Sequence, residues 1–454
     1  GVIVPVIPDP ELPEYTVYWV RDGCRIYHTW LDELTVSGRH DDTELLRTLL
    51  DDSVHALVRT QHVVSLAGNV FTGGLEEAVF DIHLGKLTNP AHRPGSPAAD
   101  GPPFRAIVLI KYAEWLLEPE QNNGTWVADV LWPAINLDLQ WISMHWNESS
   151  WDLWWPPVWG GSYWTASLQY RALLAGARLS RSVGRDVPEY ESHAHLVSQT
   201  FWNEEEGYMS ETTVTDVKTG GRSGKGVAPL TVSVLNFDPS LGCDSETFQP
   251  CSDRALSSMK VVGDAFRVIF PMSRSLSPSQ PNPLFGFFLE EKVFGGHPQY
   301  FATLHASEQL FDALITWDLI GGLQVTDVSL KFFQQFDPNI EIGTYDKGSD
   351  IYESLTYAIT ICAEEILLFL ADHMPDDYVL PMGIDGATGE PLGPRGVLHS
   401  LVSAFGVYDA YNGMIPPSWA YGGRFSGQSR NNTTVNGSSD IGIGHQFPFG
   451  LDVE

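Results

Sequence analysis

The sequence predicts an all-α protein. Eleven stretches carry apolar residues at helical spacing, and almost no stretch alternates between apolar and polar residues as a half-buried strand would. Long loops separate alternate helices. The eleven predicted helices span about 22–35, 41–66, 105–118, 126–146, 162–184, 190–202, 254–270, 300–319, 326–336, 350–373 and 395–411.

The segments between these helices are rich in proline and glycine. Residues 1–14 hold four prolines and predict an extended chain, and 67–104 read as one long loop. Residues 205–253 alternate loop with short apolar runs. The stretch 412–454 is rich in Gly, Pro and Asn, so we expect it to wrap over the surface. Since no linker composition interrupts the chain, we predict one domain over 1–454.

Composition excludes two classes of partner. The chain of 454 residues is 43% hydrophobic, which suffices for a large core. Its 57 acidic and 26 basic residues give a formal net charge of −31, the opposite of what nucleic acids and anionic membranes attract. No run of 18 apolar residues occurs, so we expect no membrane-spanning helix. The acidity therefore indicates a solvated surface.

Several features favour the secretory pathway or the extracellular space. The chain starts at Gly1 without a methionine, so we expect that a signal peptide has been removed. Five glycosylation sequons occur, at Asn123, Asn147, Asn431, Asn432 and Asn436. We expect glycans at one or more of Asn123, Asn147, Asn432 and Asn436.

The four cysteines fall into two groups. Cys243 and Cys251 bracket a short loop, and a disulfide there would stabilise the fold by about 2.5 kcal/mol through loop entropy. Cys24 and Cys362 stand in apolar helical contexts. We expect two free buried thiols at these positions rather than a second bridge.

The stretch 151–165 carries a family resemblance. Its Asp152-Leu153-Trp154 resembles the start of the catalytic loop of the glucoamylases, glycoside hydrolase family 15. Further motifs similar to those of the family follow in the same order: Tyr18–Asp22, Asp100–Ala106, Phe201-Trp202, Arg222–Lys225, Asn236–Pro239, Thr247–Ser252, Ala302–Leu314 and Thr326–Leu330. The resemblance covers essentially the whole chain and includes the cysteine pair Cys243 and Cys251.

The resemblance implies an (α/α)6 barrel of glucoamylase type with long loops. Such a barrel needs twelve helices, and the family has one further helix upstream of the position of Tyr15. We therefore infer that the family's first helix has been cleaved or lost from this chain. The resemblance includes no counterpart of the family's starch-binding module.

The residues that carry the family's chemistry are replaced. The resemblance places its general acid at Trp155, followed by Pro156, and its general base at Met382. The arginine that clamps the sugar becomes Phe287, and a pocket tryptophan becomes His399. Other sugar contacts fall at Val79, Pro94 and Ala99. The family's Trp19, Arg21, Asp22 and Asp100 are kept.

An inverting glycosidase needs two carboxyl groups, one to protonate the leaving oxygen and one to activate water. Tryptophan and methionine perform neither task. Since the replacements share one direction, from charged to apolar or aromatic, they indicate a pocket reshaped for an apolar ligand. Trp154, Trp155, Trp159, Phe287 and Met382 would line it.

The replacements predict a non-hydrolytic enzyme, a cyclase or lyase acting on an apolar or aromatic polyketide- or terpenoid-like small molecule. A dehydration, a cyclisation or a Diels–Alder type cycloaddition needs shape, dryness and a proton or hydrogen-bond donor rather than a carboxylate pair. We assign His399 to proton transfer and Arg21 and Asp22 to a polar end of the substrate, with Trp19 and Asp100 as further substrate contacts. No cofactor or metal is expected, and the oligomeric state stays open.

Two alternatives stay open. One is a sugar-binding pseudoenzyme. The other is a glucosidase with relocated carboxylates, for which Asp152, Glu290, Glu291, Asp385 and Glu390 are candidates. The stretch 290–292 otherwise reads as a solvated loop, and Asp385 as a turn residue.

Overall fold

The structure is a computed structural model, and it describes residues 3–5, 16–36, 43–87, 96–151, 153, 159–194, 201–215, 218, 221–274, 284–292 and 296–422. The chain forms two compact units. Unit 1 comprises Gly1–Phe201, Thr212–Val214 and Pro416–Gly423, and unit 2 comprises Trp202–Glu211, Thr215–Ile415 and Arg424–Glu454.

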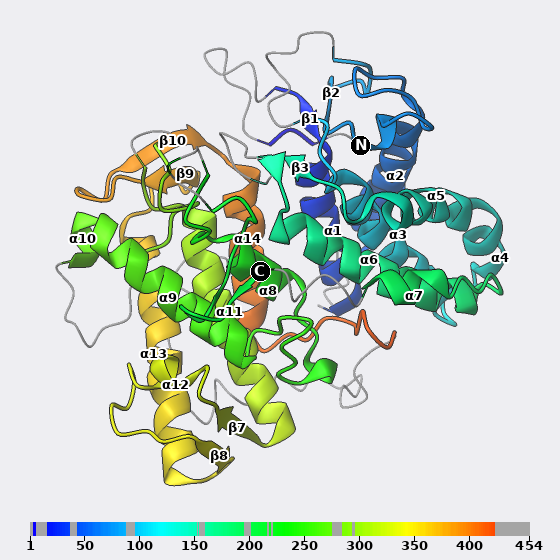
Figure 1. Ribbon diagram of the computed structural model, residues 1–454. Helices are drawn as coiled ribbons and strands as arrows, with labels where there is room; N and C mark the ends of the chain where they lie inside the picture. Colours follow the sequence, from blue (N-terminus) through cyan, green and yellow to red (C-terminus); the bar gives the residue numbers. More distant parts are fainter. Residues whose placement is uncertain are drawn as a thin grey trace. The chain divides into compact units, whose positions relative to one another are not determined.

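Unit 1 is built mainly from helices (Figure 1). Its helices are α1 (Val20–Val36), α2 (Thr43–His62), the 3-10 turn η2 (Gly74–Glu76), α3 (Gly101–Leu117), α4 (Gly124–Trp126), the π-helical η4 (Val127–Leu131), α5 (Trp132–His145), α6 (Tyr163–Ser182) and α7 (Glu189–Ala194). Its short strands are β1 (Tyr18–Trp19), β2 (Val79–Phe80), β3 (Ser150–Trp151) and β4 (Trp159–Gly160). β1 pairs with β2 and β3 with β4, both antiparallel.

Helix α3 is the centre of unit 1. It packs against α1, α5 and α6, and 14 of its 17 residues are buried. A helix that is apolar on all sides can bury its side chains only when other helices surround it. Pro102 and Pro103 stand in its first turn, where the missing N–H groups cost no helical hydrogen bond.

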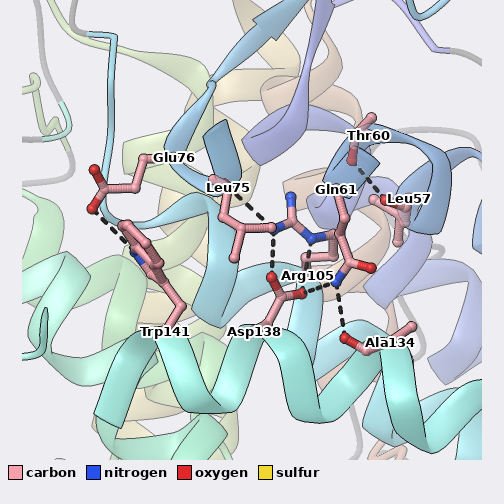
Figure 2. Close-up of polar contacts among 9 residues, drawn as sticks. All are labelled: Leu57, Thr60, Gln61, Leu75, Glu76, Arg105, Ala134, Asp138 and Trp141. Carbon is pink, nitrogen blue, oxygen red and sulfur yellow. Dashed lines mark hydrogen bonds and ion pairs between the residues drawn. The ribbon is translucent and has the colours of Figure 1, made fainter. Parts of the chain in front are cut away.

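A buried polar network ties α2, α3 and α5 together (Figure 2). Arg105 is 1% exposed and binds both carboxylate oxygens of Asp138, with Nε at 2.8 Å. Gln61 donates to Asp138 at 2.8 Å and to the carbonyl oxygen of Ala134 at 2.9 Å. Arg105 also donates to the carbonyl oxygen of Leu75. The charge pair is thus fully enclosed and hydrogen-bonded, which burial requires.

A second network binds the segment 416–422 to the helices of unit 1. Arg178 of α6 donates to the carbonyl oxygen of Trp419 and pairs with Glu114 of α3. The guanidinium of Arg171 lies 5.3 Å from the centre of the Trp419 ring. The segment that follows the last helix of unit 2 is therefore held by cations of α6.

Unit 2 repeats the helical design (Figure 1). Its helices are α8 (Ala228–Leu235), the 3-10 turn η7 (Pro239–Leu241), α9 (Asp253–Ile269), α10 (Pro271–Arg274), α11 (Tyr300–Ile320), α12 (Leu330–Phe333), α13 (Asp350–Asp372) and α14 (Leu398–Tyr411). Its strands are β5 (Trp202–Asn203), β6 (Tyr208–Met209), β7 (Gly322–Val325), β8 (Gly343–Asp346), β9 (Pro381–Ile384) and β10 (Pro391–Arg395). They form three antiparallel ribbons, β5–β6, β7–β8 and β9–β10.

Helix α11 is the centre of unit 2, since it packs against α8, α13 and α14. Serine side chains fix several helix starts by accepting a backbone N–H two or three residues on. Ser252 does so for α9 and Ser349 for α13, as Ser162 does for α6 in unit 1. Helix α13 is the one helix among the described residues that is long and apolar enough to cross a membrane by length and composition. It packs against α11.

The structure departs from the sequence prediction in several places. For the predicted helix 190–202, α7 ends at Ala194 and Trp202 lies on strand β5. Helix α8 was not predicted, because all eight of its residues are buried and its sequence, in which Thr231 and Ser233 stand between apolar residues, has no helical period. The predicted helix 126–146 contains the π-helical turn η4 just before Pro133, whose ring lacks the N–H that an α-helix would use. Within the predicted helix 326–336, only Leu330–Phe333 is helical.

The cysteine predictions are confirmed. Cys243 and Cys251 form a disulfide, whereas Cys24 and Cys362 are free and buried. Of the tail 412–454, only residues up to 422 belong to the described part of the chain.

Candidate functional site

The starts of three helices meet in unit 1. Arg21 stands in the first turn of α1, Asp100 directly precedes α3, and Trp164 stands in the first turn of α6. Arg21 Nε donates to Asp100 Oδ2 at 2.5 Å, and Trp164 Nε1 donates to the same oxygen at 2.8 Å. The Asp100 side chain is 4% exposed and that of Arg21 is 17% exposed. Asp100 therefore orients a guanidinium that keeps some access to solvent.

The neighbours of Arg21 in sequence are more enclosed. Asp22 is buried at 6% exposure. Trp19 is half-buried on β1, and it packs on a small apolar cluster. The members of that cluster are Val17, Ala78, Val79 and Ala98. Trp19, Arg21, Asp22 and Asp100 thus belong to one part of unit 1, and Asp100 binds Arg21 directly. Trp164, the second partner of Asp100, was not predicted as a site residue.

The loop with the family's catalytic motif is only partly described. Arg21 Nη1 lies 3.5 Å from the carbonyl oxygen of Leu153. Trp159 is 53% exposed, and its ring stands edge-on to Trp151 at 5.2 Å. Asp152, Trp154 and Trp155 lie outside the described residues.

Four ring side chains form a cluster in unit 2, called the Phe301 cluster below: Phe287, Phe301, His305 and His399. Phe301 is its centre, with ring-centre distances of 5.5 Å to Phe287, 5.6 Å to His305 and 5.9 Å to His399. Phe287 and His399 are half-buried, whereas Phe301 is buried. The structure thus brings together the two residues predicted at the sugar-clamp and tryptophan positions.

Two members of the Phe301 cluster were missed from the sequence. Phe301 and His305 stand four residues apart at the start of α11, which places them on one face of that helix. That spacing was the available signal. His305 is fixed on both ring nitrogens, with Thr231 Oγ1 at 3.2 Å from Nδ1 and Ser403 Oγ at 2.7 Å from Nε2.

Met382 lies on β9 and is half-buried. It packs over Gly393 of β10, whose φ is 82° and whose added Cβ would approach Met382 Cβ to 3.1 Å. Ser400 Oγ donates to the carbonyl oxygen of Pro381 at 3.0 Å. This bond holds the first turn of α14, which carries His399, against the start of β9.

The remaining acids differ sharply in their surroundings. Asp385 Oδ1 accepts the backbone N–H groups of Ala387 and Thr388, which confirms a turn residue. Glu390 is exposed, and Glu290 accepts the backbone N–H of Ser223 at 3.0 Å.

The expectation of a solvated loop is wrong for Glu291. This side chain is 8% exposed. Burial raises the pKa of Glu291 to about 8, while the Phe287 backbone N–H and the Arg222 guanidinium act in the opposite direction. The sequence pattern Glu-Glu-Lys hid this because two of its three charges do face polar partners or solvent.

Arg222 is the buried cation of this region. Its guanidinium covers the Phe288 ring at 3.6 Å, and Nη1 lies 3.6 Å from Glu211 Oε1. An added Cβ at Gly226 would approach the Glu211 carboxylate to 2.0 Å, so glycine is required there. Gly226 in turn bridges to Phe288. The segments 222–227 and 287–291 therefore form one packed structure.

Comparison with known proteins identifies the family of this helix-rich chain. The family described as Glycosyl hydrolases family 15 matches residues 3–403. Glucoamylase-1 of Schizophyllum commune is 37% identical over 428 residues, covering 93% of this chain and 71% of its own length. The glucoamylase of Neurospora crassa is 33% identical, with 99% and 70% covered.

Solved structures agree with the sequence relatives. The family 15 glucoamylase from Hypocrea jecorina superposes with a TM-score of 0.85 at 33% identity, covering 92% of this chain and 68% of that chain. The Hormoconis resinae glucoamylase gives 0.84 at 28% identity, with 92% and 70% covered. The chain is therefore a member of glycoside hydrolase family 15 with the glucoamylase fold. The prediction of an all-α fold of this type is confirmed, and the helical content is consistent with an (α/α)6 barrel.

Proposed function

We propose that this family 15 member is a non-hydrolytic enzyme that binds an apolar, partly aromatic small molecule and promotes its dehydration, cyclisation or cycloaddition. The observation that carries the proposal is the Phe301 cluster. Phe287, at the position where the family resemblance expects a sugar-clamping arginine, contacts Phe301, which contacts His399. Rings bind flat apolar molecules by stacking, whereas a sugar needs directed hydrogen bonds.

The loss of hydrolytic chemistry follows from the residue types. Trp155 and Met382 stand at the acid and base positions implied by the resemblance, and their side chains neither deliver a proton nor activate water. A pocket lined by apolar side chains also excludes water, which favours bond-forming reactions over hydrolysis.

Each candidate residue has a role by itself. In unit 1, Arg21, held by Asp100, would bind an oxygen of a ligand beside Asp22. The predicted apolar contacts are Trp154, Trp155 and Trp159 on the loop 151–165, and Phe287 and Met382 in unit 2. His399 can exchange a proton near neutral pH, as imidazoles do.

A second candidate function is sugar binding without catalysis. It is favoured by the Arg21–Asp100–Trp164 arrangement, which keeps the residues of the family's Trp-x-Arg-Asp motif. The third candidate, a glucosidase with relocated carboxylates, would draw its acid from Glu291, which is buried.

A thermal-shift comparison separates the first two functions. We expect anilinonaphthalene sulfonate or ethylnaphthalene to raise the melting temperature, and deoxynojirimycin, a glucose analogue, to leave it unchanged. The opposite pattern would support the pseudoenzyme and reject the apolar pocket.

We further propose that the protein passes through the secretory pathway, since disulfides such as Cys243–Cys251 persist in oxidising compartments. Asn147 is exposed and Asn123 is half-buried, while Asn432 and Asn436 lie outside the described residues. Mass spectrometry before and after glycosidase treatment tests attachment at these four asparagines.

A further inference from the structure

We propose that Glu291 is the group that donates a hydrogen bond, and in a dehydration a proton, to an oxygen of the bound small molecule. This inference deepens the proposed function and rests on it. It assigns a role that the replaced acid and base positions leave open.

The first argument is that the Glu291 side chain is buried while one of its oxygens lacks a hydrogen-bond partner. Glu291 is 8% exposed, and its Oε1 atom is buried with no hydrogen-bond partner among the described residues. Buried polar atoms in native structures are nearly always hydrogen-bonded, so an exception calls for a partner that binds later. A ligand oxygen is such a partner.

The second argument is position. The carboxyl group of Glu291 accepts the backbone N–H of Phe287, and the Glu291 backbone N–H donates to the carbonyl oxygen of Phe288 at 3.3 Å. Glu291 therefore belongs to the turn that carries Phe287 into the Phe301 cluster. A molecule stacked on Phe287 would lie beside the turn that holds this acid.

The third argument is protonation state. The charged groups around Glu291 are Arg222 and its partner Glu211, together with Glu290 and Lys292 on the same turn. Of these, Arg222 acts to lower the Glu291 pKa, but burial outweighs it and raises the pKa to about 8. At neutral pH the side chain is mostly a neutral acid, and a neutral carboxyl group can donate. Glu290 differs in burial: its side chain is only half-buried, although its Oε2 atom also lacks a hydrogen-bond partner among the described residues.

The proton balance of a dehydration is complete with this one group. The O–H bond of Glu291 breaks as its proton joins the leaving hydroxyl, and the C–O bond breaks to release water. The carboxylate then takes up the proton that the substrate loses from a neighbouring atom. Glu291 returns to its acid form.

The protonation state is tested without any ligand. Infrared difference spectra of the intact protein between about pH 6 and about pH 10 should show the carbonyl stretch of a protonated carboxyl group that disappears as pH rises. Asp312, whose pKa burial also raises, can contribute to this signal. Glu291→Gln should therefore remove one component of the signal, whereas Glu290→Gln should leave the whole signal unchanged. A difference spectrum that is the same in Glu291→Gln as in the wild type, or no signal at all, overturns the proposal.

Binding is tested with two matched probes, acetylnaphthalene, which carries a carbonyl oxygen, and ethylnaphthalene, which lacks it. We expect acetylnaphthalene to bind roughly threefold to tenfold more weakly once Glu291 ionises, with ethylnaphthalene unaffected. Glu291→Leu should hold acetylnaphthalene binding at the weaker level at all pH values. Glu291→Gln, whose amide still donates, should restore binding and abolish the pH dependence, whereas Glu290→Gln should behave as wild type.

The outcomes separate the two proposals. If both naphthalenes bind and Glu291→Leu changes their two affinities equally, the apolar pocket stands and the role of Glu291 is refuted. If neither binds, the proposed function fails, and the donor role of Glu291 falls with it.

Discussion

Arg171 Nη2 lies 3.2 Å from His28 Nε2 in the interior of unit 1. A guanidinium only donates, so Nε2 of this imidazole accepts, and its proton sits on Nδ1, which faces Asp32 Oδ2 at 3.1 Å. Burial and the nearby Lys111 lower the pKa of His28 to about 3. Lys111 in turn pairs with Asp32.

The buried His28 predicts that the folded state is less stable in acid. The folded state binds fewer protons at His28 than the unfolded state, so stability is complete above the ordinary histidine pKa of 6.5 and is lost as pH falls from there toward 3. At two pH units below 6.5 the cost is about 2–3 kcal/mol. Urea unfolding of His28→Gln should show a flatter acid limb than wild type. His55→Gln, at an exposed position of α2, is the control and should change nothing.

Asp312 predicts the opposite pH trend. Burial, and then the neighbouring Glu308 and Asp409, raise its pKa well above the usual value. The folded state therefore holds the proton more tightly than the unfolded state, and the stability from this group is lost as pH rises. Asp312→Asn should raise the melting temperature at about pH 8 more than at about pH 4. An equal gain at both values, or the same response in the exposed Asp327→Asn, would refute the assignment.

The network of Figure 2 predicts a large stability loss on breaking one ion pair. Asp138→Ala leaves the Arg105 charge buried and unpaired, which costs about 3–5 kcal/mol. Asp138→Asn keeps hydrogen-bond capacity and should lose less. Denaturant midpoints of the two variants decide the point, and equal midpoints would mean that the charge of Asp138 is unimportant.

Hydrolysis should be absent. With Trp155 and Met382 at the acid and base positions, we expect no measurable release of glucose from starch or maltose over hours, because losing even one such group costs about 10²–10⁴-fold. A family glucoamylase assayed in parallel is the control. Turnover within about a hundredfold of that control would point to a relocated carboxylate, with Glu291 as the first to test.

The Phe301 cluster predicts a specific loss of binding. Phe287→Arg puts a charge among the rings of Phe301 and His399 and should weaken ethylnaphthalene binding about tenfold or more. Phe71→Arg is the matched control, because Phe71 is 84% exposed. Equal affinities in titration calorimetry would place the apolar ligand elsewhere.

The sequence predicted what periodicity and short motifs encode. Long helices such as α11 and α13 have clear patterns, and the Cys243–Cys251 pair matched a family motif. Helix α8 was missed because complete burial removes the contrast between faces on which periodicity depends. Trp164 was overlooked because its bond to Asp100 joins residues 64 positions apart.

The burial of Glu291 is the most instructive difference between the sequence prediction and the structure. Charged residues in sequence predict exposure, and only tertiary packing tells which of two adjacent glutamates turns inward. Glu290 reaches a backbone N–H of a distant segment, while Glu291 turns inward to the backbone N–H of Phe287. Its altered acidity is a property of that environment and has no local signature.

The contacts of Arg171 and Arg178 with Trp419 have a consequence for biosynthesis. Most of unit 1 is complete in the nascent chain at Phe201, yet the residues that cover these two arginines emerge about 200 positions later. At ordinary ribosomal speeds of about 5–20 residues per second, this interval is on the order of ten seconds or more. The first half of the protein therefore emerges from the ribosome before the segment that contacts Arg171 and Arg178, and translation of Trp419 supplies that contact.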